Sequence, residues 1–376
     1  MKILFVIDAY FTHNNGTSIS AQRFADELRK RGHEVRVLTA CDEQKENIYS
    51  LPELTIPFFQ GLIRKHGFQF AKWKRKTIRE AVEWADIIHC FLPFVMEAKA
   101  KKVADQLGKP ATAAFHVQPQ NITSSLGTGK VDWVNNMLFR LFRNTTYNHY
   151  GHIHTPSQFM ADEISSRGYT AKIHPISNGI QSDFKWTKRP KEPKFADKIL
   201  IMMVGRLAGE KRQDLLINAL QYSKYGDKIQ LIFAGRGPKY NQYYKLGQKL
   251  KNPPIFTYLP KEDLINQLAQ CDLYVHASDM ESEAISCIEA FATGLVPVIS
   301  NSNLSATKQF ALDERSLFEA GDPQDLARAI DYWLDNPEEK HRMEKIYSES
   351  AAKYNINNSI TQFEAMLQEA IADNKK

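Results

Sequence analysis

Short apolar runs alternate with longer mixed stretches along most of the chain. The first run, "KILFVID" (residues 2–8), has the length of a buried strand. The stretch "TSISAQRFADELRKRG" that follows predicts a helix, which Gly32 ends, and "EVRVLTA" predicts the next strand. Strands that alternate with helices of this length predict a parallel sheet with crossover helices.

The same alternation continues along the chain, with one interruption. In the first half it predicts strands at 85–91, 110–116 and 151–156 and helices at 96–108 and 157–168. Residues 181–198 interrupt it, because they are polar and contain two prolines. The second half then predicts strands at 199–205, 229–235, 255–259, 272–278 and 296–300, and helices at 212–223, 241–250, 261–270, 284–293 and 358–372.

The pattern therefore predicts an α/β fold with two doubly wound Rossmann-like domains. We expect an N-terminal domain at 1–180, a linker at 181–198, a C-terminal domain at 199–355 and, at 356–376, a C-terminal helix that packs back on the N-terminal domain. Ligands of such sheets bind at the carboxyl ends of the strands, so the two domains are expected to face each other across a cleft.

Composition narrows the class of protein. Hydrophobic residues make up 43% of the chain and charged residues 24%, as in a globular protein with a substantial core. No apolar run approaches the roughly 18 residues that a membrane span needs. The apolar start is only five residues long, which argues against a signal peptide. The four cysteines are scattered without metal-ligand spacing, which favours a reducing cytoplasm.

The excess of basic residues lies entirely in the first half. Residues 1–180 contain 23 Lys and Arg against 16 Asp and Glu, whereas residues 181–376 contain 26 against 27. Such an asymmetry indicates that the first half meets an anionic surface.

Two cations follow the first predicted strand of the second half. Arg206 and Lys211, in "VGRLAGEKR", stand five positions apart in a loop that contains two glycines. Flexible cations beyond a strand end are suited to binding a diphosphate. Loop cations are more often simply solvated, so the spacing alone leaves both interpretations open.

Two glutamates mark the segment "DMESEAISCIEAFATGLVPVIS". Glu281 precedes a predicted helix, and Glu289 is the only charged residue between Ala284 and Ser300. A lone carboxylate in so apolar a run is costly to bury unless something hydrogen-bonds to it. Acidic residues before a helix can simply complement its dipole. That explanation accounts for Glu281 and Glu283 but not for Glu289.

The stretch "ESEAISCIE" resembles the E-x7-E motif of the retaining glycosyltransferases of family 4, which have the two-domain glycosyltransferase B architecture. Other segments agree in order and spacing: "KRGHEVRVLT", "ISNGI", "GRLAGEK", "FAGRGP" and "EAFATGLVPVIS". The resemblance spans essentially the whole chain. It implies that the C-terminal domain binds a nucleotide sugar and that the N-terminal domain binds the acceptor.

The resemblance also implies roles for individual residues. Arg206 and Lys211 would bind the diphosphate, and Glu289 the ribose hydroxyls. Glu281 would lie beside the hydroxyls of the donor sugar, and His116 near its reacting end, which makes these two the catalytic candidates. Three further sets complete the donor-binding candidates. The glycine of the first loop is Gly16, and the segment that touches the base contains Tyr258 and Leu259. The backbone that lines the phosphate and sugar belongs to Glu283, Ala284 and Ile285.

The chain departs from the family pattern just after Glu281. The family commonly has an aromatic residue and a glycine where this chain has Glu283 and Ala284, so the chain adds a negative charge near the expected diphosphate. Backbone binding is expected to survive the change to alanine only if φ there is negative. His116 has an alternative as well, since a lone histidine at a strand end is more often structural.

No D-x-D triplet occurs, and no cluster of His, Asp and Glu has metal-ligand spacing in the sequence. We therefore expect no cofactor and no obligatory metal. Cations and helix N–H groups would offset the charge of the leaving group instead. The resemblance implies front-face attack, in which the leaving phosphate takes the acceptor's proton, and we assign no enzyme nucleophile.

Two segments of the first half favour a membrane acceptor. Residues 61–79 contain seven Lys and Arg, three aromatic residues and no acid, and such clusters bind anionic headgroups at about 1 kcal/mol per basic residue. In residues 131–144 an apolar stripe that includes Trp133 is flanked by Arg140, which is compatible with an interfacial helix or with a core-facing one. The candidate contacts in the basic segment are Arg64, Lys65, Lys72, Trp73, Lys74, Arg75 and Lys76.

These features predict a cytoplasmic enzyme associated with the inner face of the cell membrane. Within family 4, a basic and aromatic-rich first domain resembles that of the hexosyltransferases that glycosylate membrane lipids. This resemblance implies transfer of glucose or galactose from UDP-glucose or UDP-galactose to a lipid such as diacylglycerol or ceramide. No module for binding nucleic acid is recognisable. A surface polysaccharide or other glycan acceptor is an alternative, as is a catalytically silent partner subunit of a glycosyltransferase complex. A sugar-nucleotide epimerase has the same two-domain plan, but the order of the motifs favours transfer.

Overall fold

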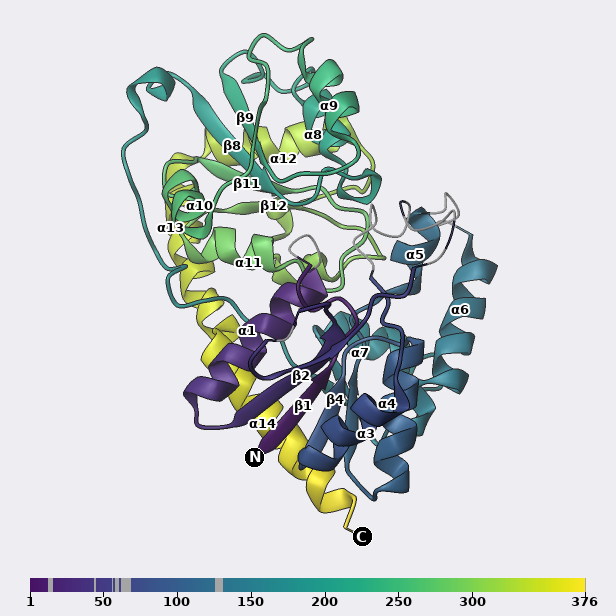
Figure 1. The fold of residues 1–376 in the computed structure, drawn as a ribbon. Coiled ribbons are helices and arrows are strands. Elements are labelled where there is room, and N and C mark those ends of the chain that lie inside the picture. The colour runs from purple at the N-terminus through teal and green to yellow at the C-terminus, as the bar shows by residue number, and fades with distance from the viewer. Residues whose placement is uncertain are drawn as a thin grey trace. The chain divides into compact units, whose positions relative to one another are not determined.

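The computed structural model describes residues 1–12, 16–43, 45–55, 57, 61, 69–125 and 131–375 of the 376-residue chain. The chain forms two compact units, which we call unit 1 (Met1–Asn178 with Asn357–Lys376) and unit 2 (Gly179–Ile356). Each unit contains a parallel β-sheet with helices packed on it (Figure 1). The prediction of two doubly wound α/β sheets is therefore confirmed.

Unit 1 has a seven-stranded parallel sheet in the order β3-β2-β1-β4-β5-β6-β7. The order reverses at β1, which lies between β2 and β4, as in other doubly wound sheets. The strands are β1 (Lys2–Val6), β2 (Glu34–Ala40), β3 (Ile48–Leu51), β4 (Ile87–Cys90), β5 (Ala111–Ala114), β6 (His152–Thr155) and β7 (Lys172–Pro175).

The helices of unit 1 cover both faces of this sheet. Successive residues of β1 point to opposite faces. Leu4 and Val6 are buried in one cluster with residues of α3, α4 and α6, whereas the ring of Phe5 packs edge-on against Phe363 of α14. The helices are α1 (Gly16–Lys30), α3 (Arg75–Trp84), α4 (Val95–Gln106), α5 (Pro119–Ser125), α6 (Asp132–Thr145), α7 (Gln158–Ser165) and α14 (Ile356–Asp373).

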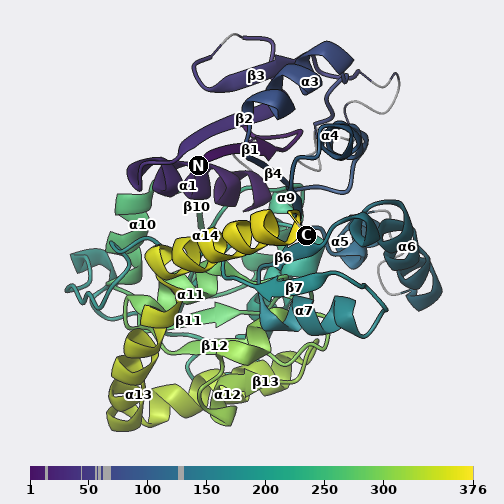
Figure 2. The same cartoon turned by 90° about the horizontal axis from the view of Figure 1, so that it is seen from below.

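The C-terminal helix α14 returns the chain to unit 1 and lies along α1 (Figure 2). The ring of Phe363 contacts the rings of Phe24 on α1 and His154 on β6. Glu364 accepts hydrogen bonds from Arg31 at 2.7 Å and from His33 at 2.8 Å. Apolar and ionic contacts therefore both attach α14 to unit 1.

Unit 2 has a six-stranded parallel sheet in the order β10-β9-β8-β11-β12-β13. Its four central strands are almost completely buried, which is why they appear in the sequence as continuous apolar runs. The strands are β8 (Ile199–Val204), β9 (Ile229–Ala234), β10 (Ile255–Thr257), β11 (Leu273–His276), β12 (Pro297–Ser300) and β13 (Leu317–Phe318). The helices are α8 (Gln213–Ala219), α9 (Tyr240–Gly247), α10 (Lys261–Leu268), α11 (Ile285–Ala292), α12 (Pro323–Asp335) and α13 (Pro337–Ser350).

The segment at 181–198, predicted as the linker, packs onto unit 2. Phe184 and Phe195 are buried in the core of that unit, and Arg189 donates its backbone N–H to the carbonyl of Ala269 at 2.9 Å. Two buried aromatic side chains therefore attach a stretch whose other residues are mostly polar and exposed.

Several elements differ from the sequence prediction. The edge strands β3, β7 and β13 were missed because they are short and only partly buried, so they lack a continuous apolar run. Helices α3, α12 and α13 were also missed, the first because it continues a strongly basic segment. Among the described residues no helix combines the length and the apolar character that crossing a bilayer requires.

Candidate functional site

The loops after β8 and β9 are held together by two glycines. A Cβ atom on Gly235 would lie 2.0 Å from the carbonyl oxygen of Gly205, and one on Gly237 would lie 2.3 Å from that of Leu207. Gly205 donates its N–H to Ala234 at 2.9 Å, and Leu207 donates to Arg236 at 3.0 Å. Only glycine permits this close backbone approach, which positions Arg206 and Arg236 beyond the carboxyl ends of their strands.

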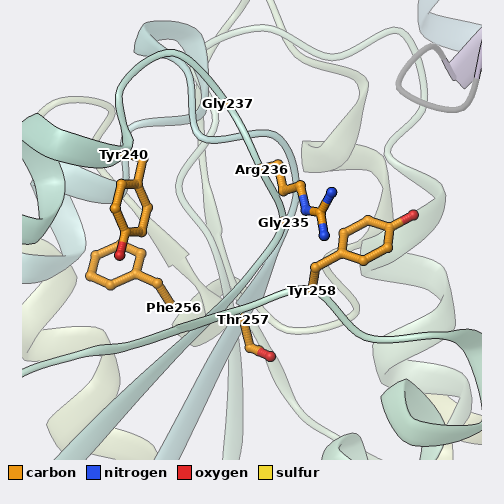
Figure 3. Close-up of a pocket in the computed structure, with 7 residues that line it drawn as sticks. All are labelled: Gly235, Arg236, Gly237, Tyr240, Phe256, Thr257 and Tyr258. Atoms are coloured by element: carbon orange, nitrogen blue, oxygen red, sulfur yellow. The ribbon is translucent and has the colours of Figure 1, made fainter.

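A pocket of about 330 Å³ lies at the carboxyl ends of β9 and β10 (Figure 3). The guanidinium of Arg236 lies over the ring of Tyr258, 4.5 Å from its centroid, and the ring of Tyr240 packs edge-on against Phe256 at 5.4 Å. In Figure 3 these two pairs lie on opposite sides of Thr257. The pocket therefore offers aromatic surfaces and one cation, a combination suited to a flat heterocyclic ring.

Lys211, Glu281 and His276 form one hydrogen-bonded group at the ends of β8 and β11. The ammonium of Lys211 donates to Oε1 of Glu281, and Nε2 of His276 lies 2.9 Å from the same oxygen. Nδ1 of His276 lies 3.3 Å from the hydroxyl of Tyr274. Because an ionised carboxylate can only accept, Nε2 of His276 is the donor in its contact with Glu281.

This group determines the ionisation of Glu281. Burial alone would raise the pKa of its carboxyl, but the charge of Lys211 and the hydrogen bond from His276 outweigh burial and hold the pKa well below its usual range. Glu281 is therefore a carboxylate at neutral pH, and Lys211 compensates its charge. An anionic ligand at this position would compete with Glu281 for Lys211.

The other predicted cation also has a carboxylate partner. Arg206 donates to Glu210 at 2.7 Å, one helical turn away in sequence. The next basic residue, Arg212, has the left-handed backbone conformation with φ 57° and lies 3.2 Å from Asp279. Each cation of the loop is thus oriented by a carboxylate before any ligand binds.

The start of α11 keeps the backbone conformation of a glycine although the residue is alanine. Ala284 precedes the helix with φ 73° and ψ 65°. From the sequence, backbone binding is expected to survive the change to alanine only if φ there is negative, and that condition is not met. The alanine instead adopts the left-handed conformation that a glycine would take, which keeps the direction of its N–H. The left-handed conformation costs a residue with a Cβ atom about 1–2 kcal/mol, which the buried residues of α11 that follow must offset.

Glu283, just before Ala284, and Glu289, five residues after it, are both buried. Burial raises the pKa of Tyr354, and the charge of Glu283 raises it further, which places Glu283 in the surroundings of that phenol. Glu289 lies in α11 among its buried residues. Ile285 is the first residue of α11, and Leu259 packs partly buried against the core of unit 2.

His116 lies in unit 1, two residues after β5, in a group of buried rings. It stacks on Phe91 at 5.9 Å and lies edge-on to His154 at 5.1 Å. Burial, and then the neighbouring His154, hold the pKa of His116 well below its usual value, so its imidazole is neutral at pH 7. Its Nε2 is buried and has no hydrogen-bond partner among the described residues. Gly16, the other candidate in this unit, is exposed at the start of α1.

The structure brings only part of the predicted site together. Lys211 and Glu281 are in contact, and Tyr258 lines the pocket. His276 and Arg236 belong to the same surroundings but were missed. Both follow or end a predicted strand, so their position at the carboxyl edge was the signal that could have identified them.

The candidates for a membrane surface are largely exposed. Lys72, Trp73, Lys74, Arg75 and Lys76 all face solvent where the chain enters α3, whereas Arg64 and Lys65 lie outside the described residues. On α6, Trp133 and Arg140 are exposed too.

Comparison with known proteins identifies the family of the chain. The family model "Glycosyltransferase Family 4" matches residues 14–184, and "Glycosyl transferases group 1" matches residues 184–349. An α-monoglucosyldiacylglycerol synthase of Streptococcus pneumoniae is 26% identical, covering 81% of this chain and 71% of its own. A GDP-mannose-dependent α-mannosyltransferase of Corynebacterium glutamicum is 27% identical, covering 80% and 72%.

Among solved structures, Alr3699/HepE of Anabaena in complex with UDP superimposes with a TM-score of 0.76. It is 17% identical, and the match covers 98% of this chain and 100% of that one, which shows a shared fold. The two family models adjoin and together cover most of the chain. The protein therefore belongs to the family 4 glycosyltransferases, a retaining family with the glycosyltransferase B fold.

Proposed function

We propose that this protein transfers glucose or galactose from a UDP-sugar to a membrane lipid such as diacylglycerol or ceramide. The group formed by Lys211, Glu281 and His276 carries the donor part of this proposal. It offers one cation for a phosphate and one carboxylate for a sugar hydroxyl at the edge of the sheet where ligands of such folds bind.

The donor would extend from the pocket toward α11. The base would enter the pocket beside Tyr258 and Leu259, and Glu289 would accept hydrogen bonds from the ribose hydroxyls. The diphosphate would draw Arg206 and Lys211 away from their carboxylate partners. The N–H groups of Glu283, Ala284 and Ile285 would add uncharged donors at the start of α11.

The chemistry exchanges one bond of the sugar for another on the same face. The bond from the anomeric carbon to the diphosphate oxygen breaks, the acceptor's hydroxyl oxygen bonds to that carbon, and its proton passes to the leaving phosphate. Arg206 and Lys211 stabilise the charge that develops on the leaving group. Glu281 orients the sugar's hydroxyls, and the neutral His116 would donate to or accept from a hydroxyl near the reacting carbon.

An exposed apolar stripe on α6 supports the lipid part of the proposal. Trp133, Met137 and Leu141, four residues apart, are 69%, 53% and 49% exposed. The core-facing residues of this helix are Asn135, Phe139 and Phe142 instead. Phe142 therefore belongs to the buried face, whereas Trp133, Met137 and Leu141 lie on the exposed face, as an interfacial helix requires.

Charge complements this stripe. Unit 1 contains the basic half of the sequence, and Lys72, Lys74 and Lys76 are exposed beside Trp73. The relative from Streptococcus pneumoniae is by its name a diacylglycerol glycoside synthase. The proposed location is therefore the cytoplasmic face of the cell membrane, with unit 1 on anionic lipid.

We expect the variant with Trp133, Met137 and Leu141 all changed to Ser to lose most of its binding to vesicles of phosphatidylglycerol and phosphatidylcholine. Each large side chain contributes on the order of 1.5–3 kcal/mol when it leaves water. Co-sedimentation measures this loss. A control variant, Tyr222→Ser, removes an exposed aromatic of unit 2 and should bind as the wild type does. Equal binding by the triple variant and the wild type would contradict the assignment of α6.

Incubation with donors and lipids tests the reaction itself. Wild-type protein with UDP-glucose and a total lipid extract should yield a new hexosylated lipid by mass spectrometry, and UDP-galactose is the parallel arm. GDP-mannose is a third arm, because the relative from Corynebacterium glutamicum is by name dependent on it. A product with GDP-mannose alone would overturn the proposed donor. A polysaccharide is added in a further arm, and a product found only there would overturn the proposed lipid acceptor.

A further inference from the structure

Two histidines, one on the edge strand β7 and one on its neighbour β6, meet one glutamate of the C-terminal helix on unit 1. His152 is the first residue of β6. His174, on β7, is paired with His154, which lies two residues after His152 on β6. Nδ1 of His152 is 3.0 Å from Nε2 of His174, and one ligand atom from each of these two residues and from Glu369 on α14 lies within 4.8 Å of the others. The three residues are far apart in sequence, so only the fold assembles them.

The surroundings of His152 resemble those of a metal-binding histidine. Its other ring nitrogen, Nε2, lies 3.3 Å from the carboxylate of Asp373 on α14. Histidines that bind metals almost always donate their second N–H to a carboxylate or carbonyl, which fixes the tautomer. Asp373 therefore leaves the lone pair of Nδ1 directed toward His174, whose Nε2 donates its proton to it when no ion is bound. An ion between the two nitrogens replaces that proton, and His174 then carries its own proton on Nδ1.

The distances match a small transition-metal ion. Two imidazole nitrogens bound to one tetrahedral Zn²⁺ at 2.0–2.1 Å are about 3.3 Å apart, close to the 3.0 Å found here. Two imidazoles and a carboxylate are a donor set that suits Zn²⁺ better than Mg²⁺ or Ca²⁺. We propose that His152, His174 and Glu369 bind Zn²⁺, and that this ion fastens α14 to the β6–β7 edge of unit 1.

Lys172 provides the alternative partner for Glu369. Its ammonium, on β7, donates to Oε1 of Glu369. The positive charge of Lys172 beside this carboxylate opposes a second cation there, so the lysine and the ion compete for Glu369. Removal of Lys172 should therefore strengthen metal binding, although it removes an ion pair from the protein.

Zinc titration of the metal-stripped, full-length protein against a chromophoric chelator tests the proposal. We expect one bound Zn²⁺ per chain, a loss of at least about tenfold in affinity in His174→Ala and Glu369→Gln, and about 10–100-fold in Asp373→Asn. Lys172→Ala should bind more tightly than the wild type. His149→Ala, which removes an exposed histidine of the same unit, is the matched control and should leave the affinity unchanged.

Each outcome decides the proposal. No Zn²⁺ binding by the wild type, or binding that survives His174→Ala, would mean that the two histidines only share a proton. Binding that His149→Ala abolishes would mean adventitious surface binding. Lys172→Ala keeps every proposed ligand, so it decides the question even if a ligand variant fails to fold, and weaker binding in it overturns the proposal. Zn²⁺ should also raise the melting temperature of the wild type but not of His174→Ala.

Discussion

Lys211→Ala is expected to weaken UDP binding by about 1.5–3 kcal/mol, the usual contribution of a hydrogen bond to a charged group. Lys211 is the cation beside Glu281 at the end of β8, and the proposed diphosphate would take it as a partner. Calorimetric titration with UDP measures the change. Affinity for UDP-glucose should fall by a similar factor, because the lost contact is to the phosphate.

The variant also removes the cation that compensates Glu281, so its folding must be checked separately. Without Lys211, burial should raise the pKa of Glu281, and the melting temperature should fall. Lys251→Ala is a suitable control, because Lys251 pairs with Asp227 at the surface of unit 2 before β9 and β10 begin. Equal UDP affinity in Lys211→Ala and Lys251→Ala would remove Lys211 from the site.

Glu281→Gln is expected to lower kcat on the order of 10²-fold or more, the scale found when one group that stabilises a transition state is removed. The amide keeps the shape of the side chain but loses the charge that holds both Lys211 and His276. The affinity for UDP should stay equal or increase, because the variant no longer holds Lys211 away from the phosphate. The rate would thus fall without any loss of UDP affinity.

This difference distinguishes the proposed role from a structural one. If Glu281 only stabilised the loop before α11, the variant would lose a little of both rate and affinity. Asp227→Asn, which removes the exposed carboxylate of the Lys251 pair, should change neither. If the Glu281→Gln enzyme forms the hexosylated product with the wild-type kcat, this result would exclude the residue from the reaction.

Local patterns were sufficient to predict most elements of both sheets. The central strands of unit 2 are buried on both faces, and this burial requires the continuous apolar runs that the sequence displays. The capping serine of α7 was equally visible, since Ser157 accepts from the N–H of Met160 at 3.2 Å. Such features depend on residues that are close together in the chain.

The candidate site was only partly predictable for the same reason. Motifs identify Lys211 and Glu281, but no local pattern indicates that they contact each other across 70 residues or that His276 completes the group. The left-handed conformation of Ala284 could not be predicted either, because alanine disfavours it locally. The exposed face of α6 likewise depends on which side of the helix the sheet covers.

The sequence by itself determined the fold class, the family and the order of strands and helices, because each of these depends on short-range periodicity and short motifs. The tertiary structure alone decided which charges are paired and which apolar residues remain exposed, and it alone assembled His152, His174 and Glu369. Pairing and exposure depend on contacts between residues that are distant in the chain, and hydrophobic periodicity contains no information about which distant residues those are.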